Sequence, residues 1–164
     1  MVTGYSSTSS TSRREYEVFL SFRGTDTRKG FTDFLYTYLV DADIHTFRDD
    51  DELHVGEEIG PELLKAIKES KISIPIFSKN YASSKWCLRE LAQIVECHTN
   101  EGQMIYPIFY DVDPSCVQHQ KGSYKKAFRN HRKSVDEQTT KQWMEALEIV
   151  GELKGLELKK ETNM

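Results

Sequence analysis

The sequence predicts an α/β domain, in which a doubly wound parallel sheet of five strands carries helices on both faces. From Glu15 onward, short apolar runs alternate with amphipathic segments, as in sheets wrapped by helices. The chain has 164 residues, which suits one domain with a buried core. No apolar run approaches the length of about eighteen residues that a membrane span needs. We therefore expect a globular domain without a membrane-spanning segment.

Composition narrows the function classes further. The formal net charge of −4 makes nucleic acid an unlikely partner. Residues 3–12 contain eight Ser or Thr, so we expect residues 1–14 to be a disordered lead without the apolar core of a secretory signal. Residues 15–164 are expected to form the domain. The three cysteines form no Cys-x-x-Cys pair, which favours a reducing compartment, the cytoplasm or alternatively the nucleus.

Each expected element follows from a local pattern. Apolar runs predict strands at residues 18–22, 44–47, 72–77, 104–110 and 156–158. Helical spacing predicts helices at residues 31–39, 61–70, 86–99, 124–133 and 139–153. Asp26 or Thr27 is the expected N-cap of the first helix, and Pro61 suits the first position of the second. Residues 78–85 are expected to be a polar connection with a short turn, and a loop is expected to begin at Asp113-Pro114.

The order of strands predicts where chemistry takes place. In the flavodoxin-like order 2-1-3-4-5, the first and third strands flank the point at which the winding reverses. Ligands of such sheets bind beyond the carboxyl ends of the strands at that point. Candidate residues are therefore expected in segments 22–27 and 78–90 and in the loop that begins at Arg48.

Glu90 is the most unusual side chain in those segments. At 100° per residue, Glu90 falls beside Trp86 and Ile94 on the border of the apolar helix face, away from the polar side. Burial there would raise the pKa of the carboxyl unless a cation lies near, and Arg23 and Arg48 are within plausible reach. A buried ion pair that orients the helix and a functional carboxylate remain alternatives.

Other familiar sites are absent from the sequence. The acidic run Asp49–Glu52 lacks the ligand spacing of a calcium loop, and the acidic residues of a phospho-acceptor receiver are missing, so a solvated acidic loop is favoured. No phosphate-binding glycine motif and no Gly-x-Ser-x-Gly elbow occurs. Cys97-His98 is too isolated for a zinc site. No metal site is predicted.

Charge is distributed unevenly along the chain. Residues 41–62 contain nine acids and one base, whereas residues 121–133 contain six bases and no acid. Two ordinary solvated surfaces would explain this, but opposite patches on one chain also favour head-to-tail self-association.

Several segments, taken together, resemble a plant Toll/interleukin-receptor (TIR) domain. They are YEVFLSFRGTDTR (16–28), FTDFL (31–35), TFRDD (46–50), YASSKWCLREL (81–91), PIFYDVDPS (107–115) and QKGSYKKAF (120–128). Similar domains occur in nucleotide-binding leucine-rich-repeat immune receptors and in TIR-only proteins. The resemblance implies the same flavodoxin-like fold.

The resemblance also implies an activity and its residues. It implies an NAD⁺ nucleosidase that acts on self-association to trigger plant defence and cell death, with NAD⁺ or alternatively NADP⁺ as substrate and no tightly bound cofactor. Glu90 matches the catalytic glutamate. The matching substrate-binding residues are Arg23, Gly24, Arg48, Ser84 and Trp86. Residues Asp49, Asp50, Asp51, Glu52 and Gly56 match a mobile loop.

Self-association in the family implies two further surfaces. The first helix contributes Phe31, Asp33 and Phe34, and the basic segment contributes Lys121, Lys125, Lys126 and Arg129, with a second copy or another TIR domain as partner. Family members continue into a last helix that is missing here, which would bare an apolar strip on one sheet face. A non-catalytic TIR–TIR scaffold is the competing hypothesis.

Overall fold

The core of the fold is a parallel sheet. The computed structural model describes residues 16–49 and 58–159. Its strands are β1 (Val18–Phe22), β2 (Thr46–Arg48), β3 (Ile72–Phe77), β4 (Met104–Ile105), β5 (Ile108–Tyr110) and β6 (Leu156–Leu158). The order is β2-β1-β3-β5-β6, with β4 paired to β3, and every pairing is parallel. The predicted doubly wound, flavodoxin-like fold is confirmed, with one extra strand.

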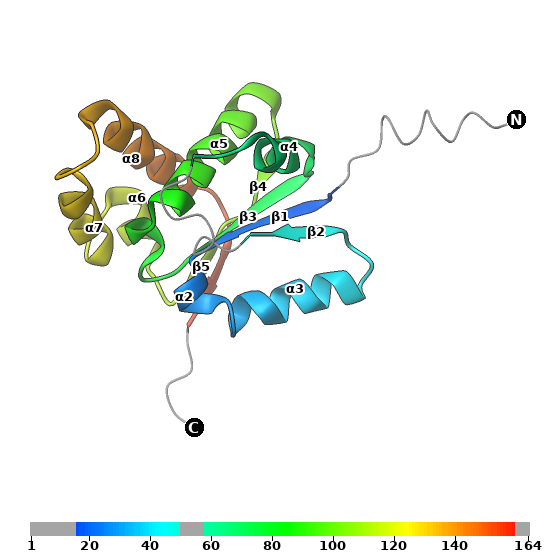
Figure 1. Cartoon of the computed structure of the whole chain (residues 1–164). Coiled ribbons are helices and arrows are strands. Elements are labelled where there is room, and N and C mark those ends of the chain that lie inside the picture. Colours follow the sequence, from blue (N-terminus) through cyan, green and yellow to red (C-terminus); the bar gives the residue numbers. More distant parts are fainter. Residues whose placement is uncertain (1–15, 50–57, 160–164) are drawn as a thin grey trace, which may run out of the picture.

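Helices cover both faces, but unequally (Figure 1). They are α2 (Gly24–Thr27), α3 (Phe31–Asp41), α4 (Pro61–Glu69), α5 (Lys85–Glu101), α6 (Pro114–His119), α7 (Ser123–His131) and α8 (Glu137–Gly151), with a 3-10 turn η2 (Tyr81–Ser83). In Figure 1, α2 and α3 lie on one side of the sheet, and α4, α5 and α8 lie on the other.

The predicted strand 104–110 is wrong as a single element. The structure divides it into β4 and β5 at Tyr106-Pro107. Pro107 has no backbone N–H to donate to a neighbouring strand, and its carbonyl accepts a hydrogen bond from the Leu156 backbone N–H at 3.0 Å. Gly155 lies so close to that carbonyl that a Cβ would clash with it. One apolar run therefore supplies two strands.

Three smaller expectations also change. The second strand lies at 46–48 rather than 44–47. Asp26 and Thr27 lie inside the short helix α2, and the N-cap of α3 is Gly30 without a side-chain bond. Instead of a loop, Asp113-Pro114 begins α6, because Asp113 accepts a hydrogen bond from the Ser115 backbone N–H at 2.8 Å. The other predicted helices and the short turn are confirmed within a few residues.

Each face of the sheet has its own apolar core. Phe19 and Phe77 face the larger core, which includes Leu88, Leu91 and Trp143. Val18, Leu20 and Phe22 face α3 in a smaller core. On that second face, Met104 is 57% exposed and Leu156 is 41% exposed. These two side chains leave an exposed apolar strip on the second face.

Candidate active site

The first turn of α5 is tied to the end of β1. Ser84 is the N-cap of α5, and its hydroxyl accepts a hydrogen bond from the Cys87 backbone N–H at 3.1 Å. The Cys87 thiol donates to the carbonyl of Phe22 at 3.3 Å. These two contacts fix where α5 begins relative to the carboxyl end of β1. We call this contact between the start of α5 and the end of β1 the α5–β1 junction. It fixes the direction of the first two turns of α5 and therefore the positions of their side chains.

Glu90 is buried at this junction, with an exposed fraction of 1%. The Ser21 hydroxyl donates to its Oε1 at 2.9 Å, and the Trp86 indole N–H donates to its Oε2 at 3.0 Å. Since each oxygen accepts a hydrogen bond, the arrangement fits an ionised carboxylate. The helical-wheel prediction that Glu90 lies away from the solvent face is therefore confirmed.

Tyr81 adds a second hydroxyl behind Ser21. The phenol oxygen lies 2.7 Å from Ser21 Oγ and 3.3 Å from the Cys87 carbonyl. Burial raises the pKa of Tyr81 well above its usual value, and nearby Cys87 and Glu90 add to the shift. The phenol is therefore a neutral hydrogen-bond donor at physiological pH.

The cations expected near Glu90 are placed differently from one another. Arg48 forms an ion pair with Asp33 at 3.4 Å, and its guanidinium lies 4.1 Å from the centre of the Tyr36 ring. These two contacts of Arg48 are both with residues of α3, and a role of Arg48 beside Glu90 stays a prediction. Arg23 is half-buried and precedes the buried Gly24, the first residue of α2.

The residues expected to bind substrate do not all converge. Trp86 and Ser84 lie in the first turn of α5 and are buried, and Arg23-Gly24 follow β1 directly. Arg48 and the half-buried Asp49 end the described part of the β2 segment. Asp50, Asp51, Glu52 and Gly56 lie outside the described residues.

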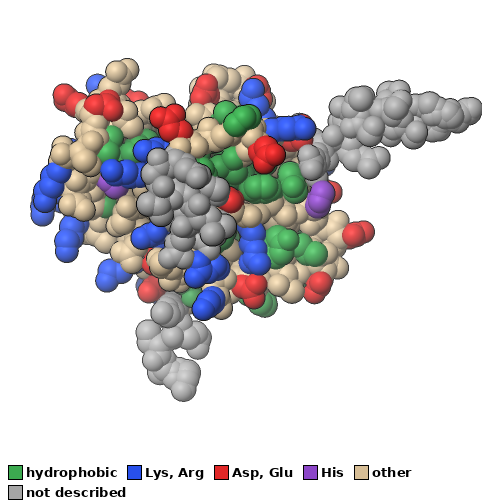
Figure 2. All heavy atoms as spheres, viewed as in Figure 1, with side chains coloured by type: hydrophobic (Ala, Val, Ile, Leu, Met, Phe, Trp, Pro, Cys, Tyr) green, Lys and Arg blue, Asp and Glu red, His purple; other side chains and the backbone are tan. Residues whose placement is uncertain are grey.

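The two surfaces expected for self-association are separate. On α3, Phe34 is 67% exposed, whereas Phe31 stacks on Tyr110 with ring centres 5.2 Å apart. The basic residues Lys121, Lys125, Lys126 and Arg129 lie on or just before α7, and all four are exposed. Lys and Arg side chains gather at the left of Figure 2, where Figure 1 places α7.

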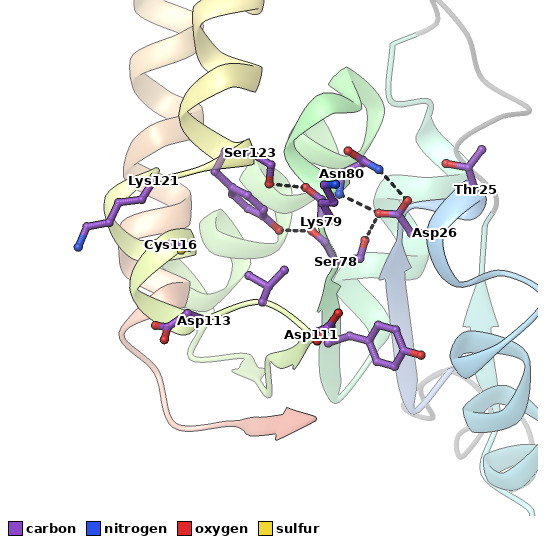
Figure 3. A pocket seen from close by; sticks show the side chains of 13 residues that line it. Thr25, Asp26, Ser78, Lys79, Asn80, Asp111, Asp113, Cys116, Lys121 and Ser123 are labelled. Atoms are coloured by element: carbon purple, nitrogen blue, oxygen red, sulfur yellow. Dashed lines mark hydrogen bonds between the residues drawn. The ribbon is translucent and has the colours of Figure 1, made fainter. Parts of the chain in front are cut away.

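An open pocket of about 520 Å³ also lies at the carboxyl edge of the sheet (Figure 3). Asp26 accepts hydrogen bonds there from the Ser78 hydroxyl at 2.5 Å and from the Asn80 backbone N–H and side-chain amide at 2.8 and 3.1 Å. The Tyr124 hydroxyl donates to the Ser78 carbonyl at 2.7 Å. Since these groups bind one another, they join α2 to the segment after β3.

Sequence reasoning missed Ser21 and Tyr81. The detectable signal was a single hydroxyl inside the apolar strand 18–22, on the face that alternation assigns to α5. No local pattern indicates that Tyr81, 60 residues away in sequence, would meet that hydroxyl.

The described residues contain neither a cluster of metal-binding side chains nor a helix that could span a membrane. Within residues 16–49 and 58–159, no group of three or more His, Cys, Asp or Glu side chains could hold a metal ion. None of the helices there is long and apolar enough to cross a membrane.

Comparison with known proteins identifies close relatives. The chain is 52% identical to the TMV resistance protein N of Nicotiana glutinosa over 151 residues, which are 91% of this chain and 13% of that protein. It is 50% identical to the disease resistance protein RPV1 of Vitis rotundifolia over 143 residues, which are 87% of this chain and 10% of that protein. The chain thus spans about a tenth of the length of these relatives.

A solved structure matches the fold as well. The TIR domains in the structure of the activated Roq1 resistosome directly recognising the pathogen effector XopQ superpose with a TM-score of 0.78. The two chains are 48% identical, and the match covers 87% of each. The model of the TIR domain family matches residues 15–164. This chain therefore belongs to the TIR domain family.

Proposed function

We propose that this chain is a plant immune-signalling TIR domain that cleaves the nicotinamide–ribosyl bond of NAD⁺ when copies of it associate. The observation that carries the proposal is Glu90, a buried carboxylate with a hydrogen-bond donor on each oxygen. It lies beside the ends of β1 and β3, where ligands of doubly wound sheets bind. The disease-resistance relatives support the signalling role.

Cleavage of the nicotinamide–ribosyl bond mainly requires a fixed negative charge near the ribose. The C1′–N bond breaks, its electron pair neutralises the pyridinium nitrogen, and nicotinamide leaves. Water then adds to C1′ and releases a proton. The positive charge that develops on the ribose is stabilised by the nearby carboxylate of Glu90. A carboxylate has about four acceptor positions, and in the proposed complex ribose hydroxyls donate to Glu90 beside Ser21 and Trp86.

The remaining site residues have supporting roles in the proposal. Arg23 and Gly24 form the pocket wall, and Ser84 and Trp86 contact the substrate from the start of α5. Arg48 binds a phosphate or ribose oxygen after its ion pair with Asp33 opens. NADP⁺ is the alternative substrate for the same residues.

Access to Glu90 links the proposed catalysis to assembly. With 1% of Glu90 exposed, substrate reaches the carboxylate only after neighbouring groups move. Contacts between copies can supply the free energy for that rearrangement. The exposed α3 face around Phe34 and the basic residues of α7 are the proposed contact surfaces. The free cysteines Cys87, Cys97 and Cys116 fit the cytoplasm or nucleus.

A non-catalytic TIR–TIR scaffold is the second candidate. Two observations favour it: the burial of Glu90 and the exposure of Phe34 and Tyr38, at 67% and 64%. A scaffold needs only the exposed surfaces, and it places no demand on the carboxylate.

Nicotinamide release distinguishes the two candidates. The protein is incubated with NAD⁺ over a range of concentrations, and nicotinamide is quantified for wild type, Glu90→Gln and Glu96→Gln. Glu96 is on the exposed face of the same helix, so its variant controls for loss of one charge. The enzyme proposal expects release that rises more than linearly with concentration, falls at least about 100-fold in Glu90→Gln, and persists in Glu96→Gln. No release from a verified oligomer would establish the scaffold.

Salt tests the proposed basic contact surface. If α7 binds an acidic surface of a second copy, association weakens as salt shortens the screening length to about 8 Å. Association that does not change with salt would assign the contact to an apolar surface such as the α3 face.

A further inference from the structure

We propose that Ser21 and Tyr81 are positioning residues, which hold and orient the Glu90 carboxylate through a chain of two buried hydroxyl groups. The inference rests on the proposed function, because it assigns the support of the same carboxylate. It adds Ser21 from β1 and Tyr81 from η2 to the residues proposed for that site.

The direction of the hydrogen bonds follows from counting protons. Ser21 has one hydroxyl proton, and the 2.9 Å bond to Glu90 Oε1 uses it. The 2.7 Å contact between Ser21 Oγ and Tyr81 therefore requires the phenol to donate. The Cys87 carbonyl, at 3.3 Å, is the longer second acceptor of the same phenol proton. The chain runs from the Tyr81 hydroxyl to Ser21 and then to Glu90. Each hydroxyl polarises the next, so the bond to the carboxylate is stronger than a lone serine would give.

The three groups are held by three different elements. Ser21 lies in β1, between β2 and β3 in the sheet, and is fully buried. Tyr81 is fully buried in η2, and its ring packs edge-on against Phe77 with ring centres 4.9 Å apart. Glu90 lies on the second turn of α5. Since the surrounding packing restricts every rotamer, the Oε1 oxygen has a fixed direction.

Trp86 completes the arrangement from the other side. Its indole N–H binds Oε2 at 3.0 Å, so each carboxylate oxygen has its own donor. Two donors from different elements prevent rotation of the carboxyl group about its Cγ–Cδ bond. Both donors also favour the charged form, which is the form that stabilises developing positive charge on a ribose.

The experiment removes single hydroxyl groups and includes matched controls. Ser21→Ala and Tyr81→Phe break the chain, and Ser21→Cys substitutes a weaker donor of similar size. Ser73→Ala removes another fully buried serine hydroxyl, which lies in β3 and donates to the Gln103 side chain. Tyr124→Phe removes another buried phenol, which binds the Ser78 carbonyl. The kcat and KM of nicotinamide release are measured from about pH 4 to about pH 9. This range includes the ordinary pKa values of carboxyl and imidazole groups, about 4 to 7.

We expect Ser21→Ala to lower kcat roughly 10- to 100-fold, with KM close to wild type. The acidic limb of its pH profile moves about one unit upward, because a carboxylate that has lost a donor ionises at higher pH. Tyr81→Phe moves the acidic limb of the pH profile in the same direction by a smaller amount. The acidic limb of Ser21→Cys lies between those of wild type and Ser21→Ala. The Ser73 and Tyr124 variants retain the wild-type limb.

A second readout is independent of catalysis. NMR titration of ¹³C-labelled glutamate carboxyls, with Glu90 assigned through Glu90→Gln, reports its ionisation directly in wild type and in Ser21→Ala. An upward shift of the midpoint in Ser21→Ala and not in Ser73→Ala supports the hydroxyl chain even if no nicotinamide is released, in which case only the enzyme proposal fails. An unchanged midpoint overturns the hydroxyl chain, and measured nicotinamide release would then leave the enzyme proposal standing.

Discussion

The two faces of the sheet differ in how much structure covers them. On one face, the packing of α4, α5, α7 and α8 gives a core in which Leu88 and Leu147 are fully buried. On the other face, α3 and the short α2 cover the sheet (Figure 1), and Phe34, Tyr38 and Met104 remain 57–67% exposed. We call these the thick face and the thin face.

The difference indicates a division of roles. The Glu90 network lies on the thick face, where close packing holds hydrogen-bonding groups within a few tenths of an ångström. The thin face exposes apolar side chains that solvent does not favour, and such patches mark contact surfaces. The thick face is thus suited to a fixed site, and the thin face is suited to contact with another copy.

The largest expected difference between the faces is in stability. Trp143→Ala on the thick face should lower the free energy of unfolding by about 3–5 kcal/mol, because Trp143 is 2% exposed. Phe34→Ala on the thin face should change it by less than about 0.5 kcal/mol. Urea unfolding followed by circular dichroism measures both. Similar losses in the two variants would contradict the comparison.

Self-association should respond in the opposite way. Phe34→Ser should weaken association at least about tenfold, or about 1.4 kcal/mol, while the monomer stays folded. Thr37→Ser, a small change at another exposed position of α3, is the matched control. Sedimentation velocity over a range of concentrations gives the dissociation constants. Equal association of both variants with wild type would remove the thin face from assembly.

Helix capping gives a smaller effect. The thick-face helices α5 and α8 have side-chain N-caps, Ser84 and Asp136, whereas the N-cap of α3 is Gly30. Ser84→Ala should cost about 1 kcal/mol of stability and also lower nicotinamide release. Asp136→Ala should lower the melting temperature without affecting release, since it caps a helix outside the site. Equal loss of release in both would mean that Ser84 acts through stability alone.

The smallest expected effect is a dependence of stability on pH. Burial lowers the pKa of His131 below its usual value of about 6.5, despite its 2.7 Å hydrogen bond to the Ala82 carbonyl; Lys85 lowers it further. The unfolded chain therefore takes up this proton first as pH falls. The folded state therefore keeps its full stability, as far as His131 is concerned, above about pH 6.5. Below that pH, protonation of His131 in the unfolded chain lowers the free energy of unfolding.

His131→Gln tests this contribution. Unfolding in urea at pH 7.5 and 5.5 (values on either side of the unfolded pKa of about 6.5) should show a smaller pH dependence for the variant than for wild type. The same dependence in both proteins would assign the effect to other groups.

Much of the fold could be predicted because its signals are local. The spacing of Phe31, Leu35 and Leu39 predicts a helix, and Pro61 marks the start of another. The position of Glu90 on its helix predicted burial for the same reason, since helical geometry depends only on nearby residues. Pro107 was a local signal that segment 104–110 divides, whereas its close contact with Gly155 is visible only in the tertiary structure.

The amino-acid sequence by itself determined the order of elements, the parallel sheet and the side of the helix on which Glu90 lies. Tertiary structure alone decided that Glu90 meets Ser21, which is 69 residues away in sequence, whereas helical spacing already placed Trp86 beside it. Tertiary structure also decided that Arg48 forms an ion pair with Asp33 and that Asp26 accepts a hydrogen bond from Ser78. The physical reason is that periodicity constrains neighbours along one element, whereas a hydrogen bond between elements exists only after packing has set their distance and angle.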